Sequence, residues 1–212
     1  MKVLMVLAHP DDEIIFGWPI FQNPNIEKEV VMCSTDFNNP HRQQYAHRKF
    51  ILQEICNHFN VPLTCFDYPS EFYKLETRGT TLEDFQNTIV NYVKSRIDDF
   101  DYIFTHNPMG EYGMIDHKML FELMYNKVDE KPILITDLLQ YETHWPSYHS
   151  IPKRIKDTFY TNKIGDYKLD VDMYRYCYEK YKAGGAWTYW RTPETEDKKC
   201  GLYVIGDNNE KR

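Results

Sequence analysis

The chain has 212 residues, which is enough for one domain with a sizeable hydrophobic core. Its net charge of −7 comes from interspersed acidic and basic residues, which argues against a nucleic-acid or anionic-membrane partner bound by phosphate neutralisation. Its five cysteines are odd in number and lack Cys-x-x-Cys spacing, which argues against a disulfide framework and against a thiolate zinc site.

An apolar run over residues 3–8 predicts a buried strand at the start of the chain. The run is too short for a signal-peptide core or a membrane span, so we expect a cytoplasmic protein. Directly behind it, residues 8–13 read Ala-His-Pro-Asp-Asp-Glu. Pro10 favours an extended His9 and suits the first turn of a following helix, so the side chains of His9, Asp11 and Asp12 diverge from one tight turn.

The elements that follow alternate between helix and strand. We expect a helix over residues 12–21, a strand over 30–35, a helix and then a strand over 63–66. The helix before that last strand is marked by one apolar stripe: Leu52, Ile55, Cys56 and Phe59. Glu27, Lys28 and Glu29, ahead of the second strand, are typical of a solvated face.

The second half of the sheet follows the same pattern. Thr80 and Glu83 predict a capping box for a scaffold helix that leads to a strand over residues 102–106. A helix over about 116–125 and a strand over 133–137 come next. Because alternation implies a largely parallel sheet, we expect an α/β, Rossmann-like fold: a mostly parallel twisted sheet with helices on both faces, in a single domain over 1–212.

Residues 140–205 are rich in aromatic side chains, which suit the stacking of sugar rings. Half of these aromatic residues are equally well explained as core residues. In this region, apolar positions recur every four residues and so form one buried face of a helix: Leu169, Met173, Cys177 and Tyr181. Gly184 and Gly185 are expected to end that helix. The segment 186–190, with Trp187, is the expected wall of a substrate pocket.

Two polar clusters follow two of the predicted strands. The first is the turn over residues 8–13, and the second runs from His106 to His117. In an open α/β sheet, ligands bind at the carboxyl ends of the strands. Imidazole and carboxylate are ligands that Zn²⁺ takes, so His9, Asp12 and His117 are the expected metal ligands.

Both clusters closely resemble the fingerprints of the PIG-L/LmbE-type de-N-acetylases, a His-Pro-Asp-Asp-Glu turn and a Gly-x-x-Gly-His-x-Asp-His turn. The first is complete, and the second survives as residues 110–117, with Met114 in place of its first histidine. The resemblance covers residues 2–125. It implies a zinc-dependent deacetylase with His117 as a metal ligand and Asp11 as the general base. A thioether cannot donate the hydrogen bond that the family histidine supplies to the oxyanion, so another donor must replace it, or activity is low.

Tyr112 is the first substitute donor, because it matches a position where some members of the family carry a tyrosine that polarises the carbonyl. His106 and His144 are weaker candidates, and His144 is also grouped with Arg48 as a substrate-binding residue. Arg48 resembles a family arginine, but the Arg-x-x-Glu continuation reads Arg-Lys-Phe-Ile here.

Several of these residues have simpler explanations. Asp11 could serve only as a helix N-cap, and Asp116 with His117 could simply open a helix. Glu13 is expected to orient the turn or cap its helix. Asp116 is a candidate for the carboxylate that holds a histidine tautomer next to the metal.

The expected function is a metal-dependent hydrolase that removes the acetyl group from an N-acetylated amino sugar, such as an N-acetylglucosamine-type glycoside, nucleotide sugar or glycan precursor. Metal-activated water would attack while Asp11 accepts its proton. Zn²⁺ is the expected metal, although Fe²⁺ or another divalent ion could replace it. The alternative is a sugar- or nucleotide-binding module of the same fold that has lost turnover through Met114. We expect no nucleic-acid partner and no membrane span, and the sequence leaves a homo-oligomer open.

Overall fold

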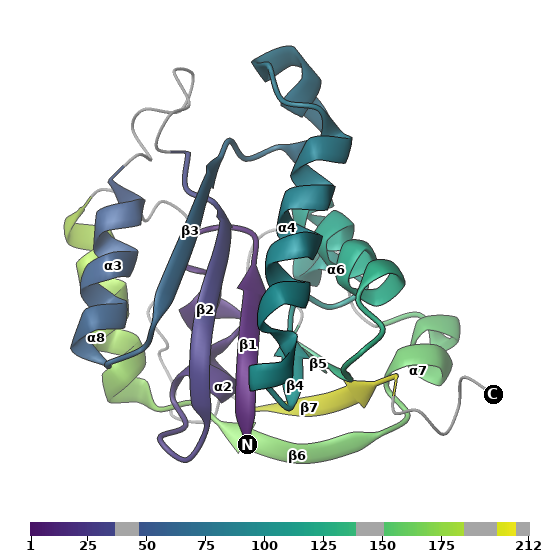
Figure 1. Cartoon of the computed structure of the whole chain (residues 1–212). Coiled ribbons are helices and arrows are strands. Elements are labelled where there is room, and N and C mark those ends of the chain that lie inside the picture. The colour runs from purple at the N-terminus through teal and green to yellow at the C-terminus, as the bar shows by residue number, and fades with distance from the viewer. Residues whose placement is uncertain (37–46, 139–150, 185–198, 207–212) are drawn as a thin grey trace.

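A twisted seven-stranded sheet forms the centre of the computed structural model, which describes residues 1–36, 47–138, 151–184 and 199–206 (Figure 1). The strands lie in the order β3-β2-β1-β4-β5-β7-β6. Their bounds are β1 (Lys2–Leu7), β2 (Glu27–Ser34), β3 (Leu63–Tyr68), β4 (Tyr102–Phe104), β5 (Ile133–Thr136), β6 (Lys163–Lys168) and β7 (Lys199–Ile205). The first five strands pair in parallel, and β7 is antiparallel to both β5 and β6. The expected mostly parallel α/β sheet is therefore confirmed.

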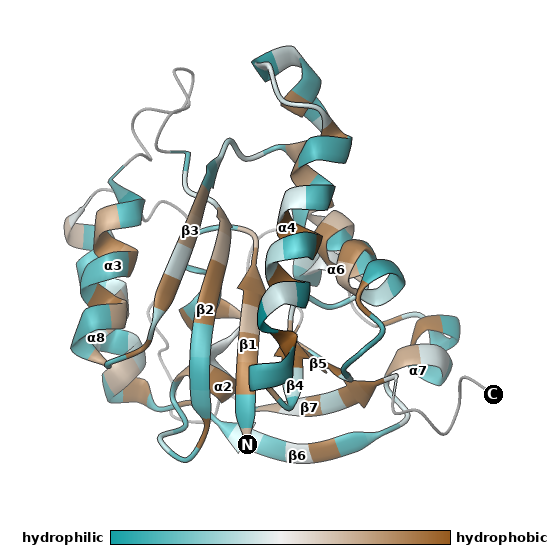
Figure 2. Ribbon diagram, viewed as in Figure 1, coloured by the Kyte–Doolittle hydropathy of each residue, from teal (hydrophilic) through white to brown (hydrophobic). Residues whose placement is uncertain are grey.

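The helices cover both faces of this sheet (Figure 1). One face packs against α1 (Asp12–Ile15), α2 (Trp18–Phe21), α3 (Arg48–His58) and α8 (Val171–Ala183). The other packs against η2 (Phe72–Arg78), α4 (Leu82–Arg96), η3 (Ile97–Asp99), α6 (Ile115–Lys127) and, at its edge, α7 (Lys153–Phe159). Because side chains alternate along a strand, β1 sends Val3 and Met5 into the first layer and Leu4 and Val6 into the second. Its burial on both faces explains its continuous apolar sequence, which is brown along β1 in Figure 2.

The helix predicted over residues 12–21 is wrong in one respect, because it is two short helices, α1 and α2. Gly17 lies between them, where a Cβ atom would come within 2.7 Å of Met5 Cε and 2.9 Å of the Glu13 carbonyl oxygen. Pro19, which has no N–H to donate, lies in the first turn of α2. The chain is thus forced to restart its helix close against β1.

The predicted capping box of α4 is wrong by one residue. Thr81 is the N-cap, and its Oγ1 accepts the Asp84 N–H at 3.0 Å. The N–H of Thr80 instead donates to the Leu75 carbonyl and belongs to the end of η2. Thr and Asp can form the same local hydrogen bonds as Thr and Glu, so the spacing alone did not separate the two registers.

The solvated face predicted for residues 27–29 is also wrong for two of the three. Glu29 is buried, and the Lys28 ammonium donates to the carbonyl oxygens of Ile20, Phe21 and Asn23. These hydrogen bonds cap the carbonyl groups at the end of α2, so Lys28 has a structural role. Only Glu27 of this group is exposed.

The apolar stripe predicted for α8 is confirmed, since Leu169, Met173, Cys177 and Tyr181 are all buried. Burying one such side chain contributes about 1.5–3 kcal/mol. Among the described helices, none combines the length and the apolar composition that crossing a membrane requires.

Candidate functional site

The two polar clusters meet at the carboxyl ends of β1 and β4, which are neighbours in the sheet. The chain order reverses between these strands, since β2 and β3 lie on one side and β5 on the other. Such a reversal is where open α/β sheets bind ligands. His9 and Asp12 come from the turn behind β1, and His117 from the first turn of α6.

Three potential metal ligands converge here. His9 Nδ1 lies 3.2 Å from His117 Nε2, and the Asp12 carboxylate oxygens lie 3.6 Å and 3.4 Å from these two nitrogens. Two ligands at tetrahedral positions about 2.1 Å from one metal would be separated by about 3.4 Å. All three residues are buried, with exposed fractions of 6%, 2% and 1%. The geometry and the chemistry of these donors therefore fit a small divalent cation.

The hydrogen bond made by Nε2 of His9 decides which ring nitrogen of His9 would face a cation. His9 Nε2 lies 2.9 Å from Asp116 Oδ2, and the Asp116 carboxylate also accepts the N–H groups of Glu71 and Phe72 at 2.7 and 2.8 Å. Burial lowers the pKa of His9, but Asp116 and Asp12 outweigh it and raise the pKa to about 9. The contact of Nε2 with Asp116 leaves His9 Nδ1 facing His117 and Asp12, where a cation would bind.

His117 and Asp12 have the opposite electrostatic balance. Burial and the neighbouring His106 lower the pKa of His117, so its ring keeps a lone pair for a cation near neutral pH. Burial raises the pKa of Asp12, but His117 and His106 hold it well below its usual range. Asp12 would therefore offer an anionic carboxylate to a cation.

Asp11 lies beside these ligands, in a turn that holds its backbone at φ 102°. Few residues with a side chain adopt this left-handed conformation, which costs on the order of 1–3 kcal/mol. The Arg48 guanidinium pairs with the Asp11 carboxylate and donates to the Pro10 carbonyl oxygen. Burial raises the pKa of Asp11 to about 7, with Arg48 opposing and Asp12 adding to the rise. Arg48 thus contacts the turn itself, and its substrate contact stays a prediction.

Glu13 connects this turn to α8. Its Oε2 accepts the Asp11 N–H at 2.9 Å, and its Oε1 accepts the Tyr181 hydroxyl at 2.7 Å. Burial, with Asp11 adding and Tyr181 opposing, raises the pKa of Glu13 to about 8. The carboxyl group therefore supports the strained turn, and the Asp11 side chain makes no capping hydrogen bond to α1.

Tyr112 lies in α5 (Gly110–Gly113), with its ring centroid 5.8 Å from that of His117. Its hydroxyl lies 2.7 Å from Met114 Sδ, a weak acceptor. Burial and the nearby Asp12 and Asp11 raise the pKa of Tyr112, so the phenol stays protonated and able to donate. The residue that differs from the family fingerprint thus contacts the candidate replacement donor.

Two further residues, Glu111 and His106, complete the cluster, and the sequence analysis missed the first of them. Glu111 Oε2 lies 2.6 Å from His117 Nδ1 and 3.2 Å from His106 Nδ1. His106, expected as a weak candidate for donating to the substrate, has a fully buried side chain stacked on His117, with ring centroids 3.7 Å apart. Glu111 lies within the second fingerprint, but only the tertiary structure shows which side chain it contacts.

Glu111, His106 and His117 are also close enough to be considered as a second metal site. However, the 2.6 Å between Glu111 and His117 is a hydrogen-bond length, well below the separation of about 3.4 Å expected for two ligands of one tetrahedral metal. These residues are better described as a support for the first group. The predicted substrate-binding residues His144 and Trp187 lie outside the described residues.

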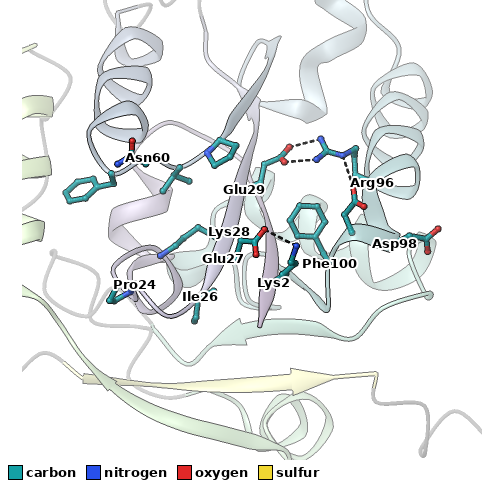
Figure 3. A pocket seen from close by; sticks show the side chains of 14 residues that line it. Lys2, Pro24, Ile26, Glu27, Lys28, Glu29, Asn60, Arg96, Asp98 and Phe100 are labelled. Carbon is teal, nitrogen blue, oxygen red and sulfur yellow. Dashed lines mark hydrogen bonds and ion pairs between the residues drawn. The ribbon is translucent and has the colours of Figure 1, made fainter.

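A groove of about 810 Å³ lies at the opposite edge of the sheet, at the amino ends of β1 and β2 (Figure 3). Its charged side chains pair with one another: Lys2 with Glu27 at 3.0 Å, and Arg96 with Glu29 at 2.9 Å (Figure 3). No histidine or cysteine is among its lining residues. The groove therefore lacks the histidine ligands found at the carboxyl ends of β1 and β4. We call these two ends of the strands the carboxyl edge and the amino edge of the sheet.

No family model matches this chain. A 133-residue stretch is 29% identical to an uncharacterized protein of Acanthamoeba polyphaga mimivirus, covering 58% of this chain. The match spans 56% of that relative's length.

Solved structures with a similar fold cover nearly the whole chain. The zinc-inhibited form of the teicoplanin deacetylase Orf2 has a TM-score of 0.59 at 11% identity, covering 98% of this chain and 100% of that one. The A40926 pseudoaglycone deacetylase Dbv21 has a TM-score of 0.57 at 10% identity, covering 96% of each chain. The 4-carboxy-2-hydroxymuconate hydratase GalB from Pseudomonas putida has a TM-score of 0.55 at 10% identity, covering 96% of this chain and 95% of that one.

At these identities the likeness establishes the fold. The hydratase shows that this fold also carries a reaction other than deacetylation, so the activity must be argued from the site. The α/β fold implied by the resemblance of the two fingerprint turns to the PIG-L/LmbE-type family is confirmed, because this chain shares its fold with the deacetylases Orf2 and Dbv21.

Proposed function

We propose that the protein is a metal-dependent hydrolase that removes the acetyl group from an N-acetylated amino sugar. The observation that carries the proposal is the convergence of His9 Nδ1, His117 Nε2 and the Asp12 carboxylate, with separations of 3.2–3.6 Å, next to an additional carboxylate, Asp11. Amide hydrolysis needs a polarised carbonyl, an activated water and a proton for the departing amine. The set of residues can serve all three needs.

His9, Asp12 and His117 would hold the metal, for which Zn²⁺ is the first candidate. When bound, a divalent metal supplies a Lewis acid that polarises the acyl oxygen and lowers the pKa of water. Asp11 accepts the proton of the attacking water and returns it to the departing amine. Arg48 and the Glu13 carboxyl hold Asp11 in place, and the Tyr112 hydroxyl donates to the developing oxyanion.

The substrate class follows from the family resemblance. The deacetylase activity is supported by the solved structures of similar fold, which include an A40926 pseudoaglycone deacetylase and a deacetylase in complex with teicoplanin. One of them was solved as a zinc-inhibited form, so other metals must be tested beside Zn²⁺. Fe²⁺ is the alternative that we consider first.

The test is an acetate-release screen over free, glycosidic and nucleotide-linked N-acetylglucosamine. The protein is stripped with a chelator and reloaded with Zn²⁺, Fe²⁺, Co²⁺ or Mn²⁺. We expect no release from the stripped protein and recovery with at least one metal. Release that is unchanged by complete removal of metal would contradict the proposal.

A second candidate function is a sugar- or nucleotide-binding module with weak or lost turnover. Met114 motivates it, because a thioether, which only accepts the Tyr112 hydroxyl, occupies the place of the family's histidine donor. If turnover survives, Tyr112→Phe lowers it about 100-fold with unchanged metal content, since one oxyanion donor is lost. If turnover is lost, Tyr112→Phe has no effect and Met114→His restores some release. Equal rates with Tyr and Phe at position 112 in an active protein would remove Tyr112 from the mechanism.

A further inference from the structure

Glu111 is a buried carboxylate between two imidazole rings, and the proposed mechanism does not use it. It is 1% exposed. Its Oε2 faces Nδ1 of both His117 and His106, and its Oε1 accepts the Asn107 N–H at 2.9 Å. Two imidazole nitrogens and one backbone N–H therefore converge on this carboxylate.

The backbone is strained in order to place this carboxylate. Glu111 has φ 55° and ψ −56°, a combination that costs a residue with a side chain on the order of 1–3 kcal/mol. Asn107 holds it there: its Oδ1 accepts the Glu111 N–H at 3.1 Å, and its Nδ2 donates to the Leu138 carbonyl oxygen at 2.8 Å. A glycine would relieve the strain but would bring no carboxylate to His117.

The contacts determine where the imidazole protons lie. An ionised carboxylate only accepts, so Nδ1 of His117 carries the proton and Nε2 keeps its lone pair toward His9 and Asp12. His106 agrees with this assignment. The Ala8 N–H donates to its Nε2 at 3.0 Å, which leaves its proton on Nδ1, toward Glu111.

We propose that Glu111 is a positioning residue that holds His117 as the Nδ1–H tautomer and thereby sets the affinity of the site for its divalent metal. The inference rests on the metal site of the proposed function. Carboxylates that orient a metal-ligating histidine typically change metal affinity by 10- to 100-fold when they are removed.

Glu111→Gln tests this with almost no change in shape. The Asn107 N–H requires an acceptor, so the glutamine oxygen must face it and the NH₂ group must face His117. That donor favours the Nε2–H tautomer, which cannot bind metal. We expect the Kd for Zn²⁺ and for Co²⁺, measured by competition with a chelator, to rise about 10- to 100-fold. Glu122→Gln is the matched control, since it makes the same change at an exposed position of α6 and should leave Kd unchanged.

A second measurement needs no variant. In ¹⁵N-labelled wild-type protein, His117 should show a protonated Nδ1, both before and after Zn²⁺ is added. A His117 protonated only at Nε2, or a Glu111→Gln protein with the wild-type Kd, would overturn the inference alone. A wild-type protein that binds no divalent metal would overturn it together with the proposed function, whereas tight metal binding without acetate release would affect only the proposed activity.

Discussion

At the carboxyl edge of the sheet the charged side chains are buried, whereas at the amino edge most of them face solvent. His9, Asp12 and His117 are all less than a tenth exposed, while the side chains of Lys2 and Glu27 in the groove are 49% and 68% exposed. An exposed ion pair contributes little to stability and costs little, because water solvates both partners. Buried ionised groups cost several kcal/mol each unless partners or a metal compensate.

This difference separates a surface feature from a candidate site. In the groove, Lys2 and Arg96 each pair with a glutamate (Figure 3), and Lys28 donates to backbone carbonyl oxygens. At the carboxyl edge, two imidazole nitrogens and the Asp12 carboxylate converge with separations of 3.2–3.6 Å, and Asp11 lies beside them. A costly arrangement of this kind is typical of a functional site.

The largest expected effect is loss of metal from the carboxyl edge. His9→Ala, Asp12→Ala and His117→Ala should each reduce the bound metal from about one ion per chain to none, because each removes one of three ligands. Elemental analysis after dialysis measures this, with Glu27→Gln in the groove as the control that keeps its metal. Asp12→Ala with a full complement of metal would contradict the ligand assignment.

Asp11→Asn should keep the metal and lower acetate release by about 100- to 10,000-fold, because an amide cannot accept a proton. Initial rates and metal content are measured on the same sample. Asp98→Asn, at the rim of the groove, is the matched control and should leave both unchanged. If Asp11→Asn also emptied the site, Asp11 would be a ligand and the division of roles would be wrong.

The pH profile should show a smaller effect of about tenfold per pH unit on its acid side. Asp11 must be ionised to accept a proton, and burial raises its pKa to about 7, so acetate release should rise with pH and level off near or below 7, since a bound cation lowers this pKa further. Arg48→Met removes a charge that favours the ionised form, and should move the rise to higher pH. A rise that moved to lower pH in this variant would contradict the assignment of Asp11 as the base.

The smallest effect is expected in the groove. Lys2→Met removes the exposed pair with Glu27 and should leave the urea midpoint, the metal content and the rate of acetate release unchanged within error. Urea unfolding followed by circular dichroism measures the first of these. A large loss of metal in Lys2→Met would show that the two edges are coupled.

Much of the fold could be predicted because local patterns report burial and turns. The continuous apolar run of β1 indicated a strand buried on both faces, and the apolar spacing from Leu169, just before α8, to Tyr181 indicated the core face of that helix. The polar turn behind β1 placed His9, Asp11 and Asp12 at the carboxyl edge of the sheet. The edge strand β6 could not be predicted in this way, because it is mostly exposed and carries no apolar alternation. The buried strand β7 does contain an apolar run, residues 202–205, which the sequence analysis did not assign to a strand.

The sequence by itself determined the residue types and the turns that carry them, since proline, glycine and apolar spacing act over a few residues. Only the tertiary structure decided which distant side chains meet. It brought Asp116 to His9 across 107 residues, Tyr181 to Glu13 across 168, and it broke the first helix at Gly17 against Met5. It also turned Glu111 toward His117 through a strained backbone that no local propensity favours. The physical reason is that the order of the strands and the packing of helices on both faces set these contacts, and both depend on the whole chain.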